Sequence, residues 1–160
     1  NLKVNMVPNV TVLAAYKNYK KLDINSIKFN DKIVAWAAQE NTKNRFKSKL
    51  ILWTIQCTES FSKKTINSLK NNRDGYQSFI LKKFEDLTGF QTKNLVFKNI
   101  HGWKYSYSNY STPLKSYWKS KLRLGVCGDW FLGPHAEHAW LSSNSLYKRI
   151  KKNPPKDRRV

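Results

Sequence analysis

The chain has 160 residues and a mass of 18.8 kDa, which suits one domain or an unequal pair of small ones. A hydrophobic content of 40% with 14% aromatic residues excludes an intrinsically disordered protein, and no apolar run approaches the roughly 18 residues of a membrane-spanning helix. The 30 basic and 10 acidic residues give a net charge of +20, which indicates either a compositional bias or an anionic partner such as nucleic acid or a membrane surface. Because the basic residues are spread along the chain and Lys outnumbers Arg, we favour the bias.

The cysteines indicate a reducing compartment. Cys57 and Cys127 lie far apart in apolar surroundings and form neither a disulfide framework nor a CxxC motif. We therefore expect two buried thiols in a cytoplasmic protein. The chain begins at Asn1 without an initiator methionine or a signal-peptide pattern, so we expect a fragment or a processed product.

Three short apolar segments in the first part of the chain predict buried strands, over residues 10–16, 33–38 and 50–55. The polar residues 41–49 predict a long loop that joins the last two strands as an antiparallel hairpin. A helix is expected to open near Glu59, with Ser62 as its N-cap and with Ile66 and Leu69 on one face.

A second helix is predicted over residues 76–88, and Gly89 is expected to end it. Four of its apolar side chains recur at helical spacing and are expected to pack in the core: Phe79, Ile80, Phe84 and Leu87. Residues 95–100 then predict another strand.

An aromatic segment follows this strand directly. In it Trp103, Tyr105 and Tyr107 alternate with small or polar residues, so an extended backbone would place the three rings on one face. Residues 108–121 are polar, contain Pro113 and predict a loop or linker.

The last part of the chain predicts a strand, a turn and a helix. The strand is expected over residues 122–127 and the helix over 135–150, with a turn at Gly133-Pro134 between them. Residues 148–160 are strongly basic and are expected to fray as a tail.

The turn between this strand and helix carries most of the functional information. A glycine after a buried strand, Gly128, would let a ligand approach the backbone, and Asp129 can accept hydrogen bonds from a sugar or ribityl hydroxyl. The helix that follows would point free N–H groups at a phosphate or at an electron-rich ring edge.

Two segments resemble renalase-like FAD-dependent amine oxidases. Residues 124–143 (LGVCGDWFLGPHAEHAWLSS) are similar to the C-terminal flavin-contacting segment of that family, and residues 101–106 (HGWKYS) are similar to a segment of its substrate domain. The order of the other predicted elements also fits. The resemblance therefore extends over nearly the whole chain, although only these two segments are specific.

This resemblance implies an α+β fold: an antiparallel or mixed sheet with helices covers the flavin, and a terminal strand and helix belong to a Rossmann-like FAD domain. We accordingly assign residues 1–112 to the substrate-domain region, 113–151 to the returning FAD-domain segment and 152–160 to a basic tail. The implied activity is hydride transfer to FAD from a small amine or a dihydronicotinamide-type substrate, with oxygen reoxidising the flavin.

The resemblance also implies the site residues. Contacts to FAD would come from Gly128, Asp129, Trp130, Glu137, His138 and Ala139. The substrate side would be lined by His101, Trp103 and Tyr105. The family's N-terminal Gly-x-Gly-x-x-Gly motif does not occur here, Lys104 stands in the place of an Arg, and His138 in that of a Gly. We therefore expect tight FAD binding only together with an N-terminal half, which would be the partner of this chain, and no activity of this chain alone.

Two other interpretations remain open. His135 and His138 with one carboxylate could hold a metal ion, although histidines at the start of a helix are more often caps or solvated residues. The aromatic and lysine side chains of residues 103–119 could stack the bases of a single-stranded nucleic acid, which would make the chain a binding module with no enzymatic activity.

Overall fold

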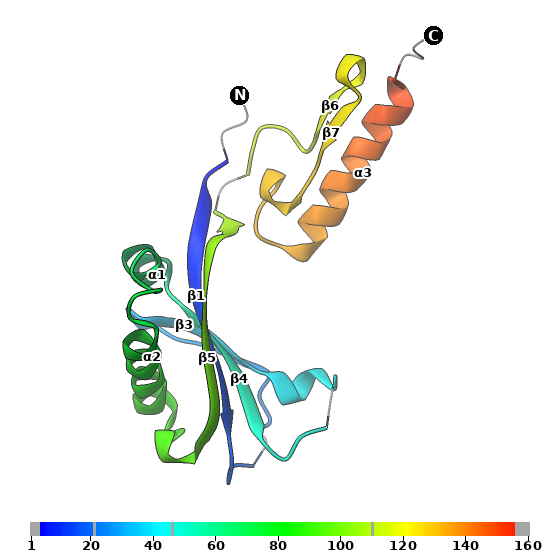
Figure 1. Cartoon of the computed structure of the whole chain (residues 1–160). Helices are drawn as coiled ribbons and strands as arrows, with labels where there is room; N and C mark the ends of the chain where they lie inside the picture. Colours follow the sequence, from blue (N-terminus) through cyan, green and yellow to red (C-terminus); the bar gives the residue numbers. More distant parts are fainter. Residues whose placement is uncertain (1–3, 21, 46, 110, 156–160) are drawn as a thin grey trace. The chain divides into compact units, whose positions relative to one another are not determined.

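The computed structural model describes residues 4–20, 22–45, 47–109 and 111–155 (Figure 1). The chain divides into two compact units, which are described separately below. The sheet unit is Pro8–Tyr105, and the terminal unit combines Asn1–Val7 with Ser106–Val160. The elements are both helices and strands, with antiparallel pairing, so the predicted α+β class is confirmed.

The sheet unit is built on five strands in the order β2-β3-β4-β1-β5. Their bounds are Met6–Tyr16 (β1), Ser26–Lys28 (β2), Val34–Gln39 (β3), Ile51–Cys57 (β4) and Leu95–Ser108 (β5). All four strands predicted in this region are present. The aromatic segment after residue 100 is extended as expected and simply continues β5.

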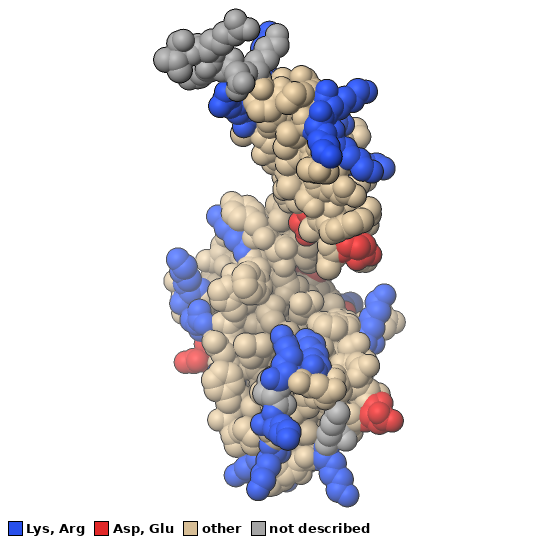
Figure 2. Space-filling view, turned by 90° about the vertical axis from the view of Figure 1, so that its right-hand side faces the viewer, with Lys and Arg blue, Asp and Glu red and all other residues tan. Residues whose placement is uncertain are grey.

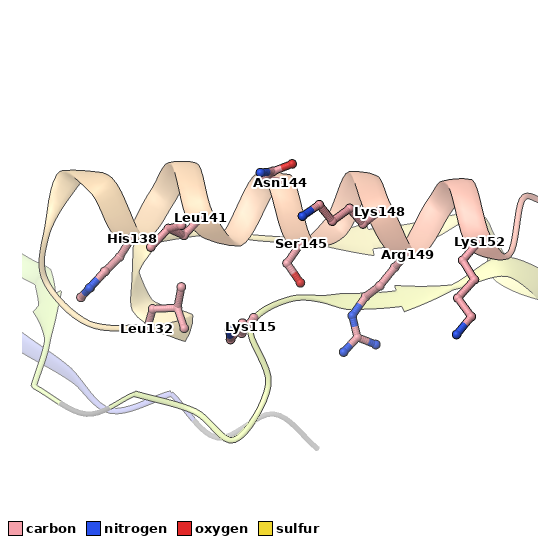
Figure 3. A pocket seen from close by; sticks show the side chains of 9 residues that line it. All are labelled: Lys115, Leu132, His138, Leu141, Asn144, Ser145, Lys148, Arg149 and Lys152. Atoms are coloured by element: carbon pink, nitrogen blue, oxygen red, sulfur yellow. The ribbon is translucent and has the colours of Figure 1, made fainter.

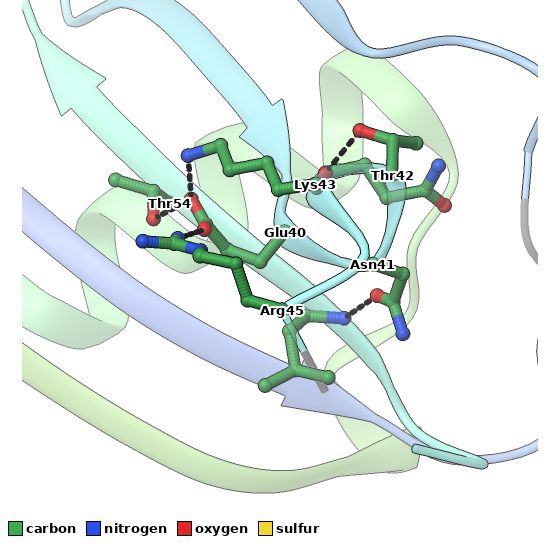
Figure 4. A network of polar contacts seen from close by, with 8 residues as sticks. Glu40, Asn41, Thr42, Lys43, Arg45 and Thr54 are labelled. Carbon is green, nitrogen blue, oxygen red and sulfur yellow. Dashed lines mark hydrogen bonds and ion pairs between the residues drawn. The ribbon is translucent and has the colours of Figure 1, made fainter. Parts of the chain in front are cut away.

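The predicted hairpin between β3 and β4 is confirmed as an antiparallel pair, and polar side chains close its loop. The Asn41 amide accepts a hydrogen bond from the Leu52 N–H (2.8 Å) and donates one to the Leu50 carbonyl (2.9 Å). Beside it the Glu40 carboxylate binds Lys43, Arg45 and Thr54 (Figure 4). A long polar loop is thereby fixed to the strand that follows it.

Both helices of the sheet unit, α1 (Glu59–Thr65) and α2 (Arg73–Thr88), lie on the same side of the sheet (Figure 1). The prediction that Ser62 caps α1 is wrong. The cap is Thr58, whose hydroxyl accepts a hydrogen bond from the Phe61 N–H (3.2 Å), because the extended backbone at Thr58 precedes the first turn. Ser62 is instead buried in the helix, and its hydroxyl accepts a hydrogen bond from the Val10 N–H of β1 (3.0 Å).

Helix α2 begins three residues before its predicted start and ends as predicted at Gly89, which has a φ of 78°. Ile80 and Phe84 are buried, as expected, but Phe79 and Leu87 are exposed. The prediction was wrong for these two because the buried stripe of α2 runs through Gln77, Ile80, Leu81 and Phe84, and Phe79 and Leu87 lie outside it.

The core of the sheet unit lies between the sheet and these helices. Alternate side chains of β1 and β4 enter it, and Trp53 packs with its ring centroid 5.5 Å from those of Phe84 and Phe90. Tyr16 is buried beside Phe90, and Cys57 is buried as predicted. Burial raises the pKa of the Cys57 thiol to about 12, so this thiol stays protonated.

The terminal unit contains a two-stranded antiparallel sheet of β6 (Tyr117–Lys119) and β7 (Leu124–Val126), followed by α3 (Ala136–Lys152). The predicted loop over 108–121 is therefore interrupted by a strand. The predicted strand over 122–127 is shortened, because residues up to Leu122 form a 3-10 turn and Arg123 has a φ of 52°.

Three further expectations about this unit are corrected. Strand β7 is mostly exposed rather than buried, since one short partner strand cannot cover it. Cys127 at its end is likewise exposed. The basic segment expected to fray from residue 148 is helical up to Lys152, while residues 156–160 lie outside the described part of the chain.

Candidate functional site

The turn between β7 and α3 is held by one buried serine. The Ser142 hydroxyl of α3 accepts a hydrogen bond from the Gly128 N–H (3.0 Å) and donates one to the Lys115 carbonyl (2.7 Å). Three segments that are distant in the sequence therefore meet at a fully buried side chain. The sequence analysis did not single out this role of Ser142, because a serine inside a helix gives no local signal of a tertiary contact.

The space above Gly128 is filled by the chain itself. A Cβ atom at this position would lie 2.4 Å from Nε1 of Trp130, so the glycine is needed for the indole ring to fold over the backbone. The Trp130 ring in turn stacks on Phe131, with the ring centroids 4.0 Å apart, and Phe131 is buried. Gly128 and Trp130 therefore stabilise the turn by packing against each other.

Asp129 combines a structural role in this turn with a carboxylate that is available to a ligand. Its backbone carbonyl accepts hydrogen bonds from the N–H groups of Leu132 (2.8 Å) and Gly133 (2.9 Å), which closes the turn. Its side chain is half-buried, and its carboxylate has no hydrogen-bond or ion-pair partner within the described part of the chain. The carboxylate can therefore accept hydrogen bonds from an external donor.

The N-terminus of α3 follows directly and is open to solvent. His135 occupies the N-cap position, but its side chain makes no capping hydrogen bond, and Ala136, Glu137 and Ala139 are exposed. The first N–H groups of a helix lack partners within the helix and carry partial positive charge. This end of α3 can therefore bind an electron-rich group.

His138 is anchored against the turn. Gly133 has a φ of 134°, which L side chains rarely adopt, and a Cβ atom there would lie 3.1 Å from Nδ1 of His138. This Nδ1 atom is buried and has no hydrogen-bond partner among the described residues. Unpaired buried polar atoms are rare in proteins, so His138 is a candidate to contact a ligand.

The expected substrate residues lie on β5 in the sheet unit. On the opposite face of this strand, a Cβ atom at Gly102 would lie 2.7 Å from both Ile66 and Leu69, so that face packs on the α1–α2 connection. Trp103 and Tyr105 therefore point away from the helices, whereas His101 also lines a cavity beside the α1–α2 connection. Trp103 is 52% exposed and Tyr105 69% exposed, while the His101 and Trp103 rings lie 4.3 Å apart.

A cavity of about 710 Å³ runs along α3 in the terminal unit (Figure 3). Lys115 and Leu132 face the helix across this cavity. The helix contributes His138, Leu141, Asn144, Ser145, Lys148, Arg149 and Lys152. This site could not be predicted from the sequence: the spacing of Leu141, Lys148 and Lys152 places them on one face of a helix, but nothing in the sequence places Lys115 opposite them.

A second cavity of about 420 Å³ lies in the sheet unit, between β5 and the α1–α2 connection. Its lining includes Lys70, Arg73, His101 and Lys104. Arg73 is already engaged there, since its guanidinium donates a hydrogen bond to the Ile100 carbonyl. This cavity is smaller, and part of its positive charge is used by the fold.

On the face seen in Figure 2 the basic residues occur in several separate groups, with few acidic residues between them. The His135 and His138 rings lie 5.1 Å apart, but no group of three or more metal-ligating side chains occurs among the described residues. Within the same residues no helix has both the length and the apolar character needed to cross a membrane. No protein-family model matches the chain.

Proposed function

We propose that the chain is part of an FAD-dependent oxidoreductase similar to the renalase-like amine oxidases, and that its terminal unit contributes to the flavin site. The observation that carries this proposal is the turn before α3. There an unpartnered carboxylate, Asp129, precedes a helix N-terminus whose first turn is exposed and uncapped. Hydroxyl donors suit the carboxylate, and an electron-rich ring edge suits the helix N–H groups.

The charges at this turn indicate which part of FAD it would hold. Asp129 and Glu137 are the only acidic residues of the terminal unit within its described part, and both lie here. Two carboxylates repel a phosphate but accept hydrogen bonds from the ribityl hydroxyls. The residues present therefore fit the ribityl and ring portion of FAD, with Asp129 as acceptor and the N–H groups of Ala136 and Glu137 as donors.

By the same resemblance, the sheet unit would have a separate role, the binding of the substrate. The uncovered rings of Trp103 and Tyr105 offer a flat apolar surface for a small amine or a dihydronicotinamide-type substrate. When bound, FAD accepts a hydride and is reoxidised by oxygen. The residues of this chain bind, orient and shield the reactants, and the free thiols of Cys57 and Cys127 support a reducing, cytoplasmic location. An N-terminal half with the dinucleotide-binding motif would be required for tight binding and for turnover.

The test is an NMR titration of the full chain with riboflavin and with FAD, because amide shifts detect weak binding and locate it. We expect shifts concentrated at residues 128–139 with both ligands. Asp129→Ala should weaken riboflavin binding by about tenfold or more, since a hydrogen bond to a charged group contributes roughly 1.5–3 kcal/mol. Asp23→Ala, a carboxylate removed from an exposed loop, is the control and should leave binding unchanged. Riboflavin shifts that are absent, or equally reduced by both variants, would refute the proposal.

A second candidate function rests on the exposed rings of β5. Lys104 lies between Trp103 and Tyr105 in the sequence, and its Nζ is 5.7 Å from the centre of the Tyr105 ring. Exposed rings beside a lysine can stack the bases and bind the phosphates of a single-stranded nucleic acid. Binding to a short oligothymidine should then quench tryptophan fluorescence, weaken steeply with salt and be lost in Trp103→Ala. If Trp103→Ala binds the oligothymidine as strongly as the unchanged chain does, the binding is due to net charge alone.

A further inference from the structure

The cavity along α3 has an unbalanced charge. Four cationic side chains line it, and no carboxylate does: the cations are Lys115, Lys148, Arg149 and Lys152. None of the four has an ion-pair partner within the described part of the chain. Like charges gathered around one space repel one another, so their assembly favours an anion between them.

Stabilisation of the helix explains only part of this arrangement. Arg149 and Lys152 lie in the last turn of α3, where positive charge interacts favourably with the helix dipole. Lys148 precedes that turn, and Lys115 belongs to a different segment, whose backbone is fixed by the hydrogen bond from Ser142. The dipole therefore gives no reason for these two lysines to face the same space.

The cavity also has distinct ends. Leu132 and Leu141 line the part nearer the start of α3, and the cations of α3 line the part nearer its end. Leu141 and Arg149 are eight residues apart, which corresponds to about 12 Å along the helix. Ser145 lies between them along the helix, and its hydroxyl shares a hydrogen bond with that of Ser116 (2.8 Å), which leaves it one further hydrogen bond to offer. Such a site suits an elongated ligand with an apolar, hydrogen-bonding part and a doubly or more highly charged end.

We propose that this cavity binds a nucleoside diphosphate group, with the diphosphate among Lys148, Arg149 and Lys152, the nucleoside toward Leu132 and Leu141, and Lys115 between the two. A volume of about 710 Å³ is within the usual range for ligands of this size. The group has two sources: a free nucleotide such as ADP, or the ADP half of a dinucleotide cofactor. Only the second source rests on the proposed flavin function.

The experiment measures binding of ADP, adenosine, FAD and riboflavin to the full chain by NMR titration, with helicity checked by circular dichroism. We expect ADP to shift amides of α3 from residue 141 onward and adenosine to bind at least about tenfold more weakly. Lys148→Gln should weaken ADP binding by about five- to twentyfold, and Lys148→Arg should restore most of it. Lys151→Gln is the matched control, because it removes the same charge from the same helix. Lys151 lies over the Tyr147 ring and outside the cavity lining, so this change should weaken ADP binding by less than about twofold.

Three outcomes would overturn the proposal. Equal losses in Lys148→Gln and Lys151→Gln would mean general attraction by net charge, and equal binding of ADP and adenosine would mean that the cations take no part. If riboflavin shifts residues 128–139 while ADP leaves α3 unchanged, this proposal fails and the flavin function stands. If ADP binds and riboflavin does not, the cavity is a site for a free nucleotide and the flavin function fails. If FAD binds no more strongly than ADP, the ligand is likewise a free nucleotide and not the ADP half of a dinucleotide cofactor.

Discussion

At the scale of single residues, Glu40 shows how one side chain holds a long loop. Its carboxylate accepts hydrogen bonds from Thr54 on β4 and from Lys43 (both 2.7 Å) and is paired with Arg45 (Figure 4). Burial alone would raise the pKa of this carboxyl group. The hydrogen bonds from Lys43 and Thr54 and the positive charge of Lys43 outweigh burial, so the pKa lies below its ordinary value.

Glu40→Gln should therefore lower the free energy of unfolding by about 1–2 kcal/mol at neutral pH. A carboxyl group whose pKa is lowered by folding stabilises the protein above the pKa of the unfolded chain, and this stabilisation is lost as the pH falls through the folded pKa. The difference between the two proteins should be constant above about pH 5 and shrink below about pH 4. Urea unfolding at several pH values measures it, and a difference independent of pH would contradict the assignment.

Gly133 is the residue at which the turn before α3 requires glycine. Its φ of 134° is strained for any other residue, and a Cβ atom would press on the His138 ring. Gly133→Ala should lower the free energy of unfolding of the terminal unit by about 1–3 kcal/mol. Pro134→Ala, one position along, should change it by less than about 1 kcal/mol. Hydrogen exchange of α3 amides provides the measurement, and similar values for both variants would show that the turn adapts.

At the scale of elements, α1 depends on two hydroxyl groups with different roles. Thr58 caps the helix, whereas Ser62 accepts a hydrogen bond from the backbone of β1 and so joins the helix to the sheet. Sequence spacing alone predicts a cap at Ser62, because the tertiary partner on β1 lies 52 residues away along the chain.

Ser62→Ala should be more destabilising than Thr58→Ala. The first change leaves the buried N–H of Val10 without its partner and costs about 1–3 kcal/mol, and the second removes a partly exposed cap and costs about 1 kcal/mol. Chemical denaturation of both variants compares the two costs. If Thr58→Ala were the more harmful change, the link between α1 and β1 would contribute little.

At the scale of the whole molecule, the two units have very different cores. The buried aromatic and aliphatic cluster around Trp53 and Phe84 belongs to the sheet unit. In the described part of the terminal unit only Val7 and Phe131 are buried large apolar residues, and several apolar side chains are exposed: Leu114, Leu122, Leu124, Trp140, Leu141 and Tyr147. The terminal unit therefore has much less apolar burial to oppose the entropy of unfolding.

Amide hydrogen exchange of the full chain should accordingly be faster in α3 than in β1 and β4, because α3 opens by local unfolding with a smaller free energy. We expect at least about tenfold faster exchange, which corresponds to a difference of about 1.4 kcal/mol. Amides of α3 protected as strongly as those of β4 would show that the terminal unit unfolds only with the sheet unit.

Local sequence patterns were sufficient for both helices of the sheet unit and for four of its five strands, whereas β2, three residues long and largely exposed, was missed. Alternation in β1 and β4, the apolar spacing of α2 and the glycine at its end each depend on near neighbours, so they can be read in one dimension. Short, exposed elements such as β6 and β7 leave no such pattern, because exposed side chains are free to vary in hydropathy.

The sequence by itself determined four strands and both helices of the sheet unit and the helix that follows Gly133-Pro134, since apolar periodicity, glycine and helix spacing are local properties. Only the tertiary structure decided that Trp130 fills the space over Gly128, that Ser142 ties the turn to Lys115 and that four cations face one cavity. Those contacts join residues that are distant in the sequence or hidden inside regular elements. They depend on packing in three dimensions, which no spacing rule along the chain records.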